Sequence, residues 1–450
     1  MKKTSLITIA LFFGTVLYGQ EAAENKPGLG GFFLATGENI LSNTLLYLAN
    51  RYIAHEAWAQ VDGDSIRDNI TGGWEWDHDE YFTNQFGHPY QGSVYHTAAR
   101  SNGFGFYQAA LFDIFGSLSW EIVFETNMPS INDLISTTLG GAALGEMFHR
   151  LYKETAGPFV VLVSPIDTIN GPILSSGRKN QHTNNIYALK FAAGVGYTYA
   201  GQSSERKKYG GTVNLSTLHV ASTDLTCTVV YGDPFVQHSV IPYNHFELLL
   251  YANLGLPFWY NLKLLSDAYM VSFSVIDTEN RRASTGLTMH YDLFTDRHID
   301  FFSQAFDWTY KHSRSFQSGV EMEFRGHVGW TVLGVDAFCA NDEYPGLRKT
   351  ENNYGTGLNI KLIFSVKKPR YGSFELKAYT YEIFNIFRNG NMDTGADFFM
   401  FFAADYYFPL WGNTVIGIAS SSLWYKSVYD SLPDRQRLTH DAKLYIAWVK

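Results

Sequence analysis

The chain has 450 residues, of which 17% are charged and 16% aromatic, with 40 glycines and a formal net charge of −9. An acidic chain gives no support to nucleic-acid binding, and a mean hydropathy of −0.13 argues against a helical membrane protein, which needs repeated apolar runs of about 20 residues. Abundant aromatic residues and glycine with few charges are typical of an outer-membrane β-barrel. Two cysteines, Cys227 and Cys339, are too few for a disulfide scaffold or a cysteine-based zinc site, and their pairing stays open.

The first residues carry the pattern of a secretory signal. Lys2 and Lys3 precede an apolar run from Leu6 to Leu17, and a polar segment follows. This run is only about 12 residues long and cannot cross a bilayer core. We therefore interpret residues 1–19 as a Sec-type signal peptide rather than as a membrane anchor.

Residues 20–165 are predicted to form a helical domain. Helices are expected over residues 39–60, 105–124 and 130–152, with a turn-rich segment between the first two. Ser130 followed by Asp133 resembles a capping box that opens the last of these helices. The helix over residues 105–124 is apolar around most of its circumference, so it must be buried.

Residues 180–450 change to a period of two. From Tyr187 to Tyr199 large and small residues alternate, and apolar and polar residues alternate in later segments, as tilted transmembrane strands require. The predicted fold is therefore mainly β: an outer-membrane β-barrel of about 12 antiparallel strands, preceded by an α-helical plug or periplasmic domain. A soluble sandwich or lipocalin-like barrel is the alternative, but a charged strand face in so large a structure fits a lumen better. His290 and Asp292 lie on the polar face of one such strand.

Polar and small residues are dense between Trp74 and Arg150. The segment contains WEWDHDEYFTNQFGHPYQG from Trp74, ARSNG from Ala99 and PSINDLISTTLGGAALGE from Pro129. Together these motifs resemble a family of uncharacterised bacterial envelope proteins known only as a domain of unknown function, over roughly Tyr52 to Pro165. The resemblance implies an outer-membrane location in diderm bacteria and brings no established activity.

A metal or acid–base site is one interpretation of this segment. Glu121 and Glu125 are spaced i,i+4 on one predicted helix, and Glu146 and His149 are spaced i,i+3 on the next. Carboxylate helices with a Glu-x-x-His element are parts of a di-metal bundle, although the full pattern needs two such elements and this chain shows one.

A buried ion-pair network is the simpler interpretation of the same glutamates. Glu121 and Glu125 would then pair with Arg100 or Arg150, or with a lumen residue such as Lys361.

An envelope-lipid hydrolase is a further interpretation, because a serine, a histidine and an orienting polar group suffice for acyl transfer. Two sets are available: Ser101 with His88 and Asn102, and Ser130 with His149 and Asp133. Neither lies in a G-x-S-x-G elbow, and Ser130 is more simply a helix cap.

A purely structural role is the remaining interpretation, because the polar side chains of a buried, turn-rich plug must hydrogen-bond its backbone N–H and C=O groups. Gly141 and Gly145 would let their helix approach another backbone closely. The candidate residues are His88, Arg100, Ser101, Glu121, Glu125, Asp133, Glu146 and His149, with Glu121, Glu125, Glu146 and His149 as candidate metal ligands.

The sequence thus predicts an outer-membrane barrel with a helical plug and a structural or gated-channel role, or alternatively an envelope-lipid hydrolase or metal-dependent enzyme. No motif identifies a cofactor, and the oligomeric state stays open. Expected partners are outer-membrane lipid and the barrel-assembly machinery, which would recognise a terminal strand with an aromatic residue such as Trp448 near its end.

Overall fold

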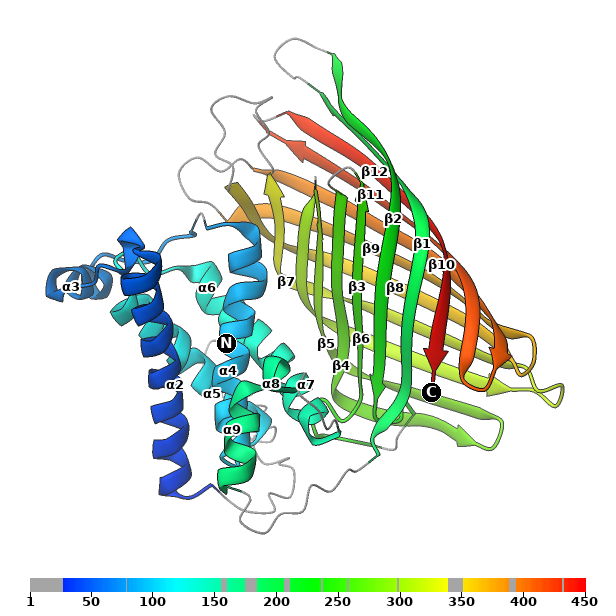
Figure 1. The fold of residues 1–450 in the computed structure, drawn as a ribbon, viewed down its shortest axis with the longest axis horizontal. Coiled ribbons are helices and arrows are strands. Elements are labelled where there is room, and N and C mark those ends of the chain that lie inside the picture. The colour runs from blue at the N-terminus through cyan, green and yellow to red at the C-terminus, as the bar shows by residue number, and fades with distance from the viewer. Residues whose placement is uncertain are drawn as a thin grey trace, which may run out of the picture. The chain divides into compact units, whose positions relative to one another are not determined.

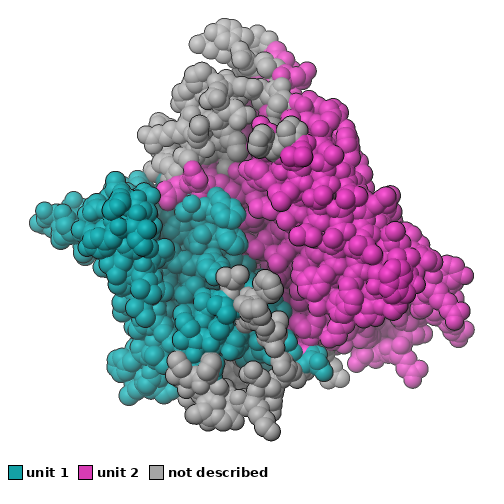
Figure 2. Space-filling view, viewed as in Figure 1, with its two compact units in different colours: residues 1–77, 82–184, 240–243 teal, residues 78–81, 185–239, 244–450 magenta. Residues whose placement is uncertain are grey.

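A computed structural model describes residues 27–77, 79–154, 160–174, 184–205, 211–235, 238–256, 259–297, 299–338, 351–387, 394–430 and 433–450. The expected signal peptide and Cys339 lie outside these residues. The chain divides into two compact units (Figure 2). The helical unit comprises residues 1–77, 82–184 and 240–243, and the barrel unit comprises residues 78–81, 185–239 and 244–450.

The helical unit consists of helices of different lengths that pack against one another (Figure 1). Its α-helices are α2 (Leu29–Ala49), α3 (Gly63–Thr71), α4 (His88–Ser101), α5 (Phe106–Ser119), α6 (Ile131–Ile135), α7 (Gly141–Glu154), α8 (Val160–Val163) and α9 (Pro165–Leu174). A 3-10 turn lies at Ala57–Ala59, and π-helical turns lie at Asn50–Ala54, Thr83–Gly87, Trp120–Phe124 and Ser136–Gly140. Within the described part of the chain, no helix is both long enough and apolar enough to span a membrane.

Two helices differ from the sequence expectation. Helix α2 starts ten residues earlier than the expected segment, at Leu29, where glycines at 30 and 31 hide the helical pattern because glycine disfavours helix interiors. Helix α3 lies in the segment expected to be turns. Its start is fixed by Asp62, whose side chain accepts hydrogen bonds from the backbone of Asp64 and Ser65.

Helix α4 packs against α2, α5, α7 and α9. It crosses α7 at a glycine pair: a Cβ added to Gly92 would lie 2.0 Å from the carbonyl oxygen of Thr137, and one added to Gly141 would lie 2.6 Å from Gly92. Such distances are far below van der Waals contact, so the backbones touch only because both residues are glycine. The expected close approach at Gly141 is confirmed.

The barrel unit consists of long antiparallel strands (Figure 1). The strands are β1 (Ile186–Glu205), β2 (Thr212–Tyr231), β3 (Phe246–Leu256), β4 (Trp259–Thr278), β5 (Arg281–Asp296), β6 (Asp300–Ser315), β7 (Glu321–Phe338), β8 (Glu351–Lys368), β9 (Gly372–Phe387), β10 (Gly395–Trp411), β11 (Thr414–Tyr429) and β12 (Asp434–Val449).

These strands form one closed barrel. Each pairs with its neighbours in chain order, and β12 returns to pair with β1, from Lys190 opposite Val449 to Glu205 opposite Asp434. Closure leaves no edge strand, which removes the unpaired backbone groups that an open sheet would expose. The predicted barrel of about 12 antiparallel strands is confirmed.

The two faces of the barrel wall differ in chemistry. Trp308 and Leu362 point outward and are 56% and 44% exposed, whereas their chain neighbours Asp307 and Lys361 point inward and are buried. Alternation of this kind runs along the strands, so the outside is apolar and the inside carries the charges. This is the arrangement of a barrel that faces lipid.

Candidate functional site

The most buried charged cluster of the helical unit joins α4, α5 and α7. His96 on α4 contacts Asp113 on α5 through Nδ1 (2.8 Å) and Glu146 on α7 through Nε2 (3.2 Å). Arg100 and Arg150 both bind Glu146, each with a shortest nitrogen–oxygen distance of 2.8 Å. We call these five residues the Glu146 cluster. Its residues other than the two arginines have fully buried side chains.

Electrostatics define the charge state of the Glu146 cluster. Burial lowers the pKa of His96, but Asp113 and Glu146 outweigh it and raise this pKa to about 9. Burial raises the pKa of Asp113 to about 6 against the opposing effect of His96. Burial also raises the pKa of Glu146, but Arg100 and Arg150 hold it well below its ordinary value. At neutral pH the cluster is therefore a set of ionised partners, with both His96 nitrogens donating.

His88 and Asp133 form a second polar contact in this unit. His88 Nε2 lies 3.7 Å from Asp133 Oδ2. Burial lowers the pKa of His88, and burial together with the charges of Asp77 and Glu121 raises the pKa of Asp133. Glu121 accepts a hydrogen bond from the backbone N–H of Ser130 at 2.8 Å.

His149 and Ser101 have partners elsewhere. His149 Nδ1 contacts Asp167 Oδ1 at 2.9 Å, and Ser164 donates to the other oxygen of the same carboxylate at 2.6 Å. Burial lowers the pKa of His149 to about 4 despite the charge of Asp167. Ser101 donates to the backbone of its own helix and accepts from Asn170.

The structure therefore distributes the candidate residues over several local contacts. Arg100 and Glu146 meet, and His88 meets Asp133. Each serine of the two hydrolase sets has a partner outside its set: Ser101 accepts from Asn170, and Ser130 donates to Asn132 while it caps α6.

The arginines of the ion-pair interpretation bind a different glutamate. Arg100 and Arg150 converge on Glu146, while Lys361 binds Asp292 in the barrel. The backbone oxygen of Glu125 accepts a hydrogen bond from the side chain of Asn69. The role of these glutamates and of His149 as metal ligands stays a prediction.

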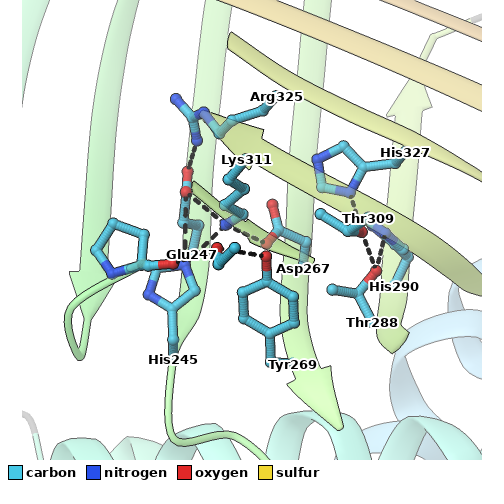
Figure 3. A network of polar contacts seen from close by, with 12 residues as sticks. His245, Glu247, Asp267, Tyr269, Thr288, His290, Thr309, Lys311, Arg325 and His327 are labelled. Atoms are coloured by element: carbon cyan, nitrogen blue, oxygen red, sulfur yellow. Dashed lines mark hydrogen bonds and ion pairs between the residues drawn. The ribbon is translucent and has the colours of Figure 1, made fainter. Parts of the chain in front are cut away.

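The barrel interior holds polar clusters (Figure 3), of which the sequence indicated only that His290 lies on a polar strand face. His290 on β5 lies 3.2 Å from Asp307 on β6, and its ring packs edge-on against that of His327 on β7 with centroids 5.0 Å apart. Thr288 and Thr309 link the two rings through hydrogen bonds of 3.0, 2.7 and 2.8 Å. We call His290, Asp307 and His327 the His290 cluster; all three are buried.

A second interior cluster surrounds an ammonium group. Lys311 Nζ on β6 lies 2.8 Å from His245 Nε2, 3.2 Å from Glu247 Oε1 on β3 and 3.4 Å from Asp267 Oδ1 on β4 (Figure 3). Arg325 on β7 binds the other oxygen of Glu247. We call these five residues the Lys311 cluster.

Further ion pairs cross the lumen between strands that are not neighbours. They include Arg325 on β7 with Glu375 on β9 (3.2 Å), Arg437 on β12 with Asp296 on β5 (2.8 Å), Arg435 on β12 with Asp336 on β7 (2.7 Å), and Lys361 on β8 with Asp292 on β5. These contacts connect strands that lie two to five positions apart around the barrel.

Aromatic side chains fill another part of the lumen. Phe301 and Phe399 stack with ring centroids 4.1 Å apart, and Phe294 and Phe401 pack beside them. A cavity of about 110 Å³ adjoins this core. Its lining includes Lys190, Lys263, Lys377 and Lys443 together with Glu375 and Asp405.

Comparisons with known proteins give one family match, over part of the chain, and several structural likenesses. Residues 73–158 match the Domain of unknown function (DUF3943). The match lies inside the segment that the motifs indicated, and it includes all five residues of the Glu146 cluster. No curated protein matches the chain.

Solved structures that resemble the chain are outer-membrane barrels. An outer-membrane channel from Pseudomonas putida F1 is 9% identical, with 59% of this chain and 98% of that one covered and a TM-score of 0.30. The KdgM porin is 6% identical (55% and 97%, TM-score 0.21), and the translocator domain of the autotransporter NalP from Neisseria meningitidis is 8% identical (63% and 96%, TM-score 0.25). At such scores these likenesses carry no argument about transport or substrate.

The location follows from the barrel itself. A closed antiparallel barrel with apolar side chains outside and charges inside is stable only where its outer wall meets lipid. The protein is therefore an outer-membrane β-barrel in contact with membrane lipid, carrying a DUF3943 segment in its helical unit.

Proposed function

We propose that the protein is a gated outer-membrane channel whose lumen is held closed by ion pairs between opposite walls. The observation that supports this most is the set of contacts from Arg325, Arg435 and Arg437 to carboxylates on non-adjacent strands. Backbone pairing already closes the barrel wall, so these contacts are not needed to hold neighbouring strands together. Side chains that bridge a lumen obstruct it, and weakening them would widen it.

The helical unit would act in this proposal as a plug or cap. The buried Glu146 cluster supports this role, because its ion pairs hold the helices of the unit together in one body. The expected division into a signal peptide (1–19), a helical domain (20–165) and a barrel (180–450) belongs to the same proposal, as does recognition of β12 by the barrel-assembly machinery.

Conductance in planar bilayers tests the gate. We expect the wild-type protein to conduct weakly and Arg325→Gln to conduct more, because the change removes a guanidinium that bridges Glu247 and Glu375. Arg282→Gln is the matched control, because Arg282 pairs with Asp233 where both side chains are 36% exposed. Equal conductance of all three proteins would contradict the gate and favour a structural role.

The enzyme alternative is tested separately. Hydrolysis of envelope phospholipids by refolded protein, lost in Ser101→Ala or Ser130→Ala, would support it; hydrolysis absent from the wild-type protein would end it.

A further inference from the structure

The barrel interior contains two clusters in which a histidine and a carboxylate present ligand atoms to one point. They are the His290 cluster and the trio His245, Glu247 and Asp267 of the Lys311 cluster. In each, the three ligand atoms lie within 4.8 Å of one another. Both trios combine the nitrogen and oxygen donors that bind divalent metal ions.

The second trio already binds a cation. Lys311 Nζ lies within 3.4 Å of all three of its ligand groups, as a metal ion would. His245 presents Nε2 to this ammonium while its Nδ1 donates to the carbonyl oxygen of Gly232 at 3.1 Å. The trio is thus an example, within this barrel, of a histidine and two carboxylates arranged around a positive charge.

The His290 cluster has two histidines and one carboxylate, and its neighbouring ammonium lies to one side. Lys361 Nζ lies 2.8 Å from His290 Nδ1, the ring nitrogen opposite to the one that faces Asp307. His327 is 0% exposed, its Nδ1 contacts Thr309, and among the described residues its Nε2 has no hydrogen-bond partner. A buried ring nitrogen that has no hydrogen-bond partner is costly unless it binds something.

We propose that His290, Asp307 and His327 bind one divalent transition-metal ion such as Zn²⁺, through Nε2 of each histidine and a carboxylate oxygen of Asp307. The distance of 3.2 Å between His290 Nε2 and Asp307 Oδ2 matches the ~3.3 Å that separates two ligands at ~2.0 Å from a tetrahedral zinc ion. Two imidazoles and one carboxylate favour zinc or ferrous iron over calcium or magnesium, which prefer oxygen ligands.

Ion binding requires a change of tautomer at His290. Lys361 donates to His290 Nδ1, so neutral His290 carries its own proton on Nε2, where its hydrogen-bond partner is Thr288. A metal ion that bonds to Nε2 requires this proton to move to Nδ1, and the ammonium of Lys361 would then bind Asp292 alone.

The site would join three neighbouring strands. His290, Asp307 and His327 lie on β5, β6 and β7, so one ion would connect side chains that the backbone ladder does not connect. Thr309 holds the second nitrogen of His327 and fixes its ring, as outer partners of metal ligands do.

Titration of untagged, refolded full-length protein with Zn²⁺ tests the proposal, with stoichiometry checked by elemental analysis. We expect one zinc ion per chain in the wild-type protein and affinity lower by at least about 100-fold in Asp307→Asn and His327→Gln, because loss of an outer partner alone costs 10–100-fold. His219→Gln is the matched control, an exposed histidine of β2 that should leave affinity unchanged.

Two further measurements sharpen the test. Lys361→Gln should bind zinc more tightly than the wild-type protein, because the change removes a neighbouring cation that also donates to His290 Nδ1. Circular dichroism confirms that each variant retains its strands. No stoichiometric zinc in the wild-type protein, affinity unchanged in both ligand variants, or affinity lost only in His245→Gln would overturn the proposal. None of these readouts depends on whether the barrel conducts.

Discussion

The helical unit and the barrel both bury charged side chains, but they do so in different structural settings. In the helical unit the Glu146 cluster lies where α4, α5 and α7 cross, and the contacts between its side chains connect those helices. In the barrel the Lys311 cluster lies in the lumen, and the strands that surround it are already joined by backbone hydrogen bonds. Removing a charge from the Glu146 cluster should lower the stability of the helical unit. Removing a charge from the Lys311 cluster should mainly change the polar lining of the lumen.

The largest expected effect is that of Glu146→Gln. The substitution leaves Arg100 and Arg150 as buried positive charges facing a neutral amide, while His96 keeps Asp113. Breaking a buried ion pair in this way costs about 3–5 kcal/mol. Helical circular dichroism at 222 nm during chemical denaturation should show this loss, and Glu56→Gln, an exposed residue of the same unit, should not. If both variants unfold like the wild type, the Glu146 cluster does not hold the unit together.

The same variant connects the two regions. If the helical unit gates the barrel, conductance of Glu146→Gln should rise under conditions where the helical signal is lost and the strand signal remains. Unchanged conductance under those conditions would remove the plug from the proposed function.

A pH dependence of the helical unit comes next in size. The folded-state pKa of His96, about 9, is above its ordinary value of 6.5, so the folded state binds more protons and stability falls as pH rises from 6.5 through 9, by about 3 kcal/mol. The contribution is fully present below pH 6.5. Denaturation midpoints at pH 6 and pH 9 should differ in the wild type and converge in His96→Gln; a midpoint that rises with pH would reverse the assignment.

A smaller effect is expected in the barrel. Lys311→Met removes an ammonium from Glu247 and Asp267, but Arg325 still binds Glu247. Loss of charged hydrogen bonds costs about 1.5–3 kcal/mol, with strand circular dichroism unchanged below the melting temperature. Collapse of the strand signal would show that lumen charges, and not only the backbone ladder, hold the wall.

The smallest effect tests a local contact. Ser130 accepts from the backbone of Asp133 at 3.2 Å at the start of α6, and removal of such a cap in Ser130→Ala costs about 1 kcal/mol. The variant should shift the helical denaturation midpoint only slightly. A loss as large as that of Glu146→Gln would indicate that Ser130 does more than cap a helix.

Features carried by neighbouring residues could be predicted from the sequence. The strand alternation is a period of two along one segment, and the Ser130 cap joins residues only three positions apart. Both could therefore be predicted without knowledge of the fold. The close approach at Gly141 followed from the absence of side chains there.

Pairing between distant residues was not predictable in the same way. His96 and Asp113 sit on different helices, and Lys361 reaches Asp292 only because β8 and β5 face each other across the lumen. The sequence placed His290 and Asp292 on a polar strand face, but their partners depend on strand number, tilt and register, which alternation does not contain.

The seam between β1 and β12 determines the order in which the barrel can be completed. Every other strand pairing joins neighbours in the chain, whereas this one brings together residues such as Lys190 and Val449, more than half the sequence apart. Loop-closure entropy opposes such contacts, so the seam should be the last pairing to form and the slowest. Until then β1 and β12 are open edges that invite pairing with other chains.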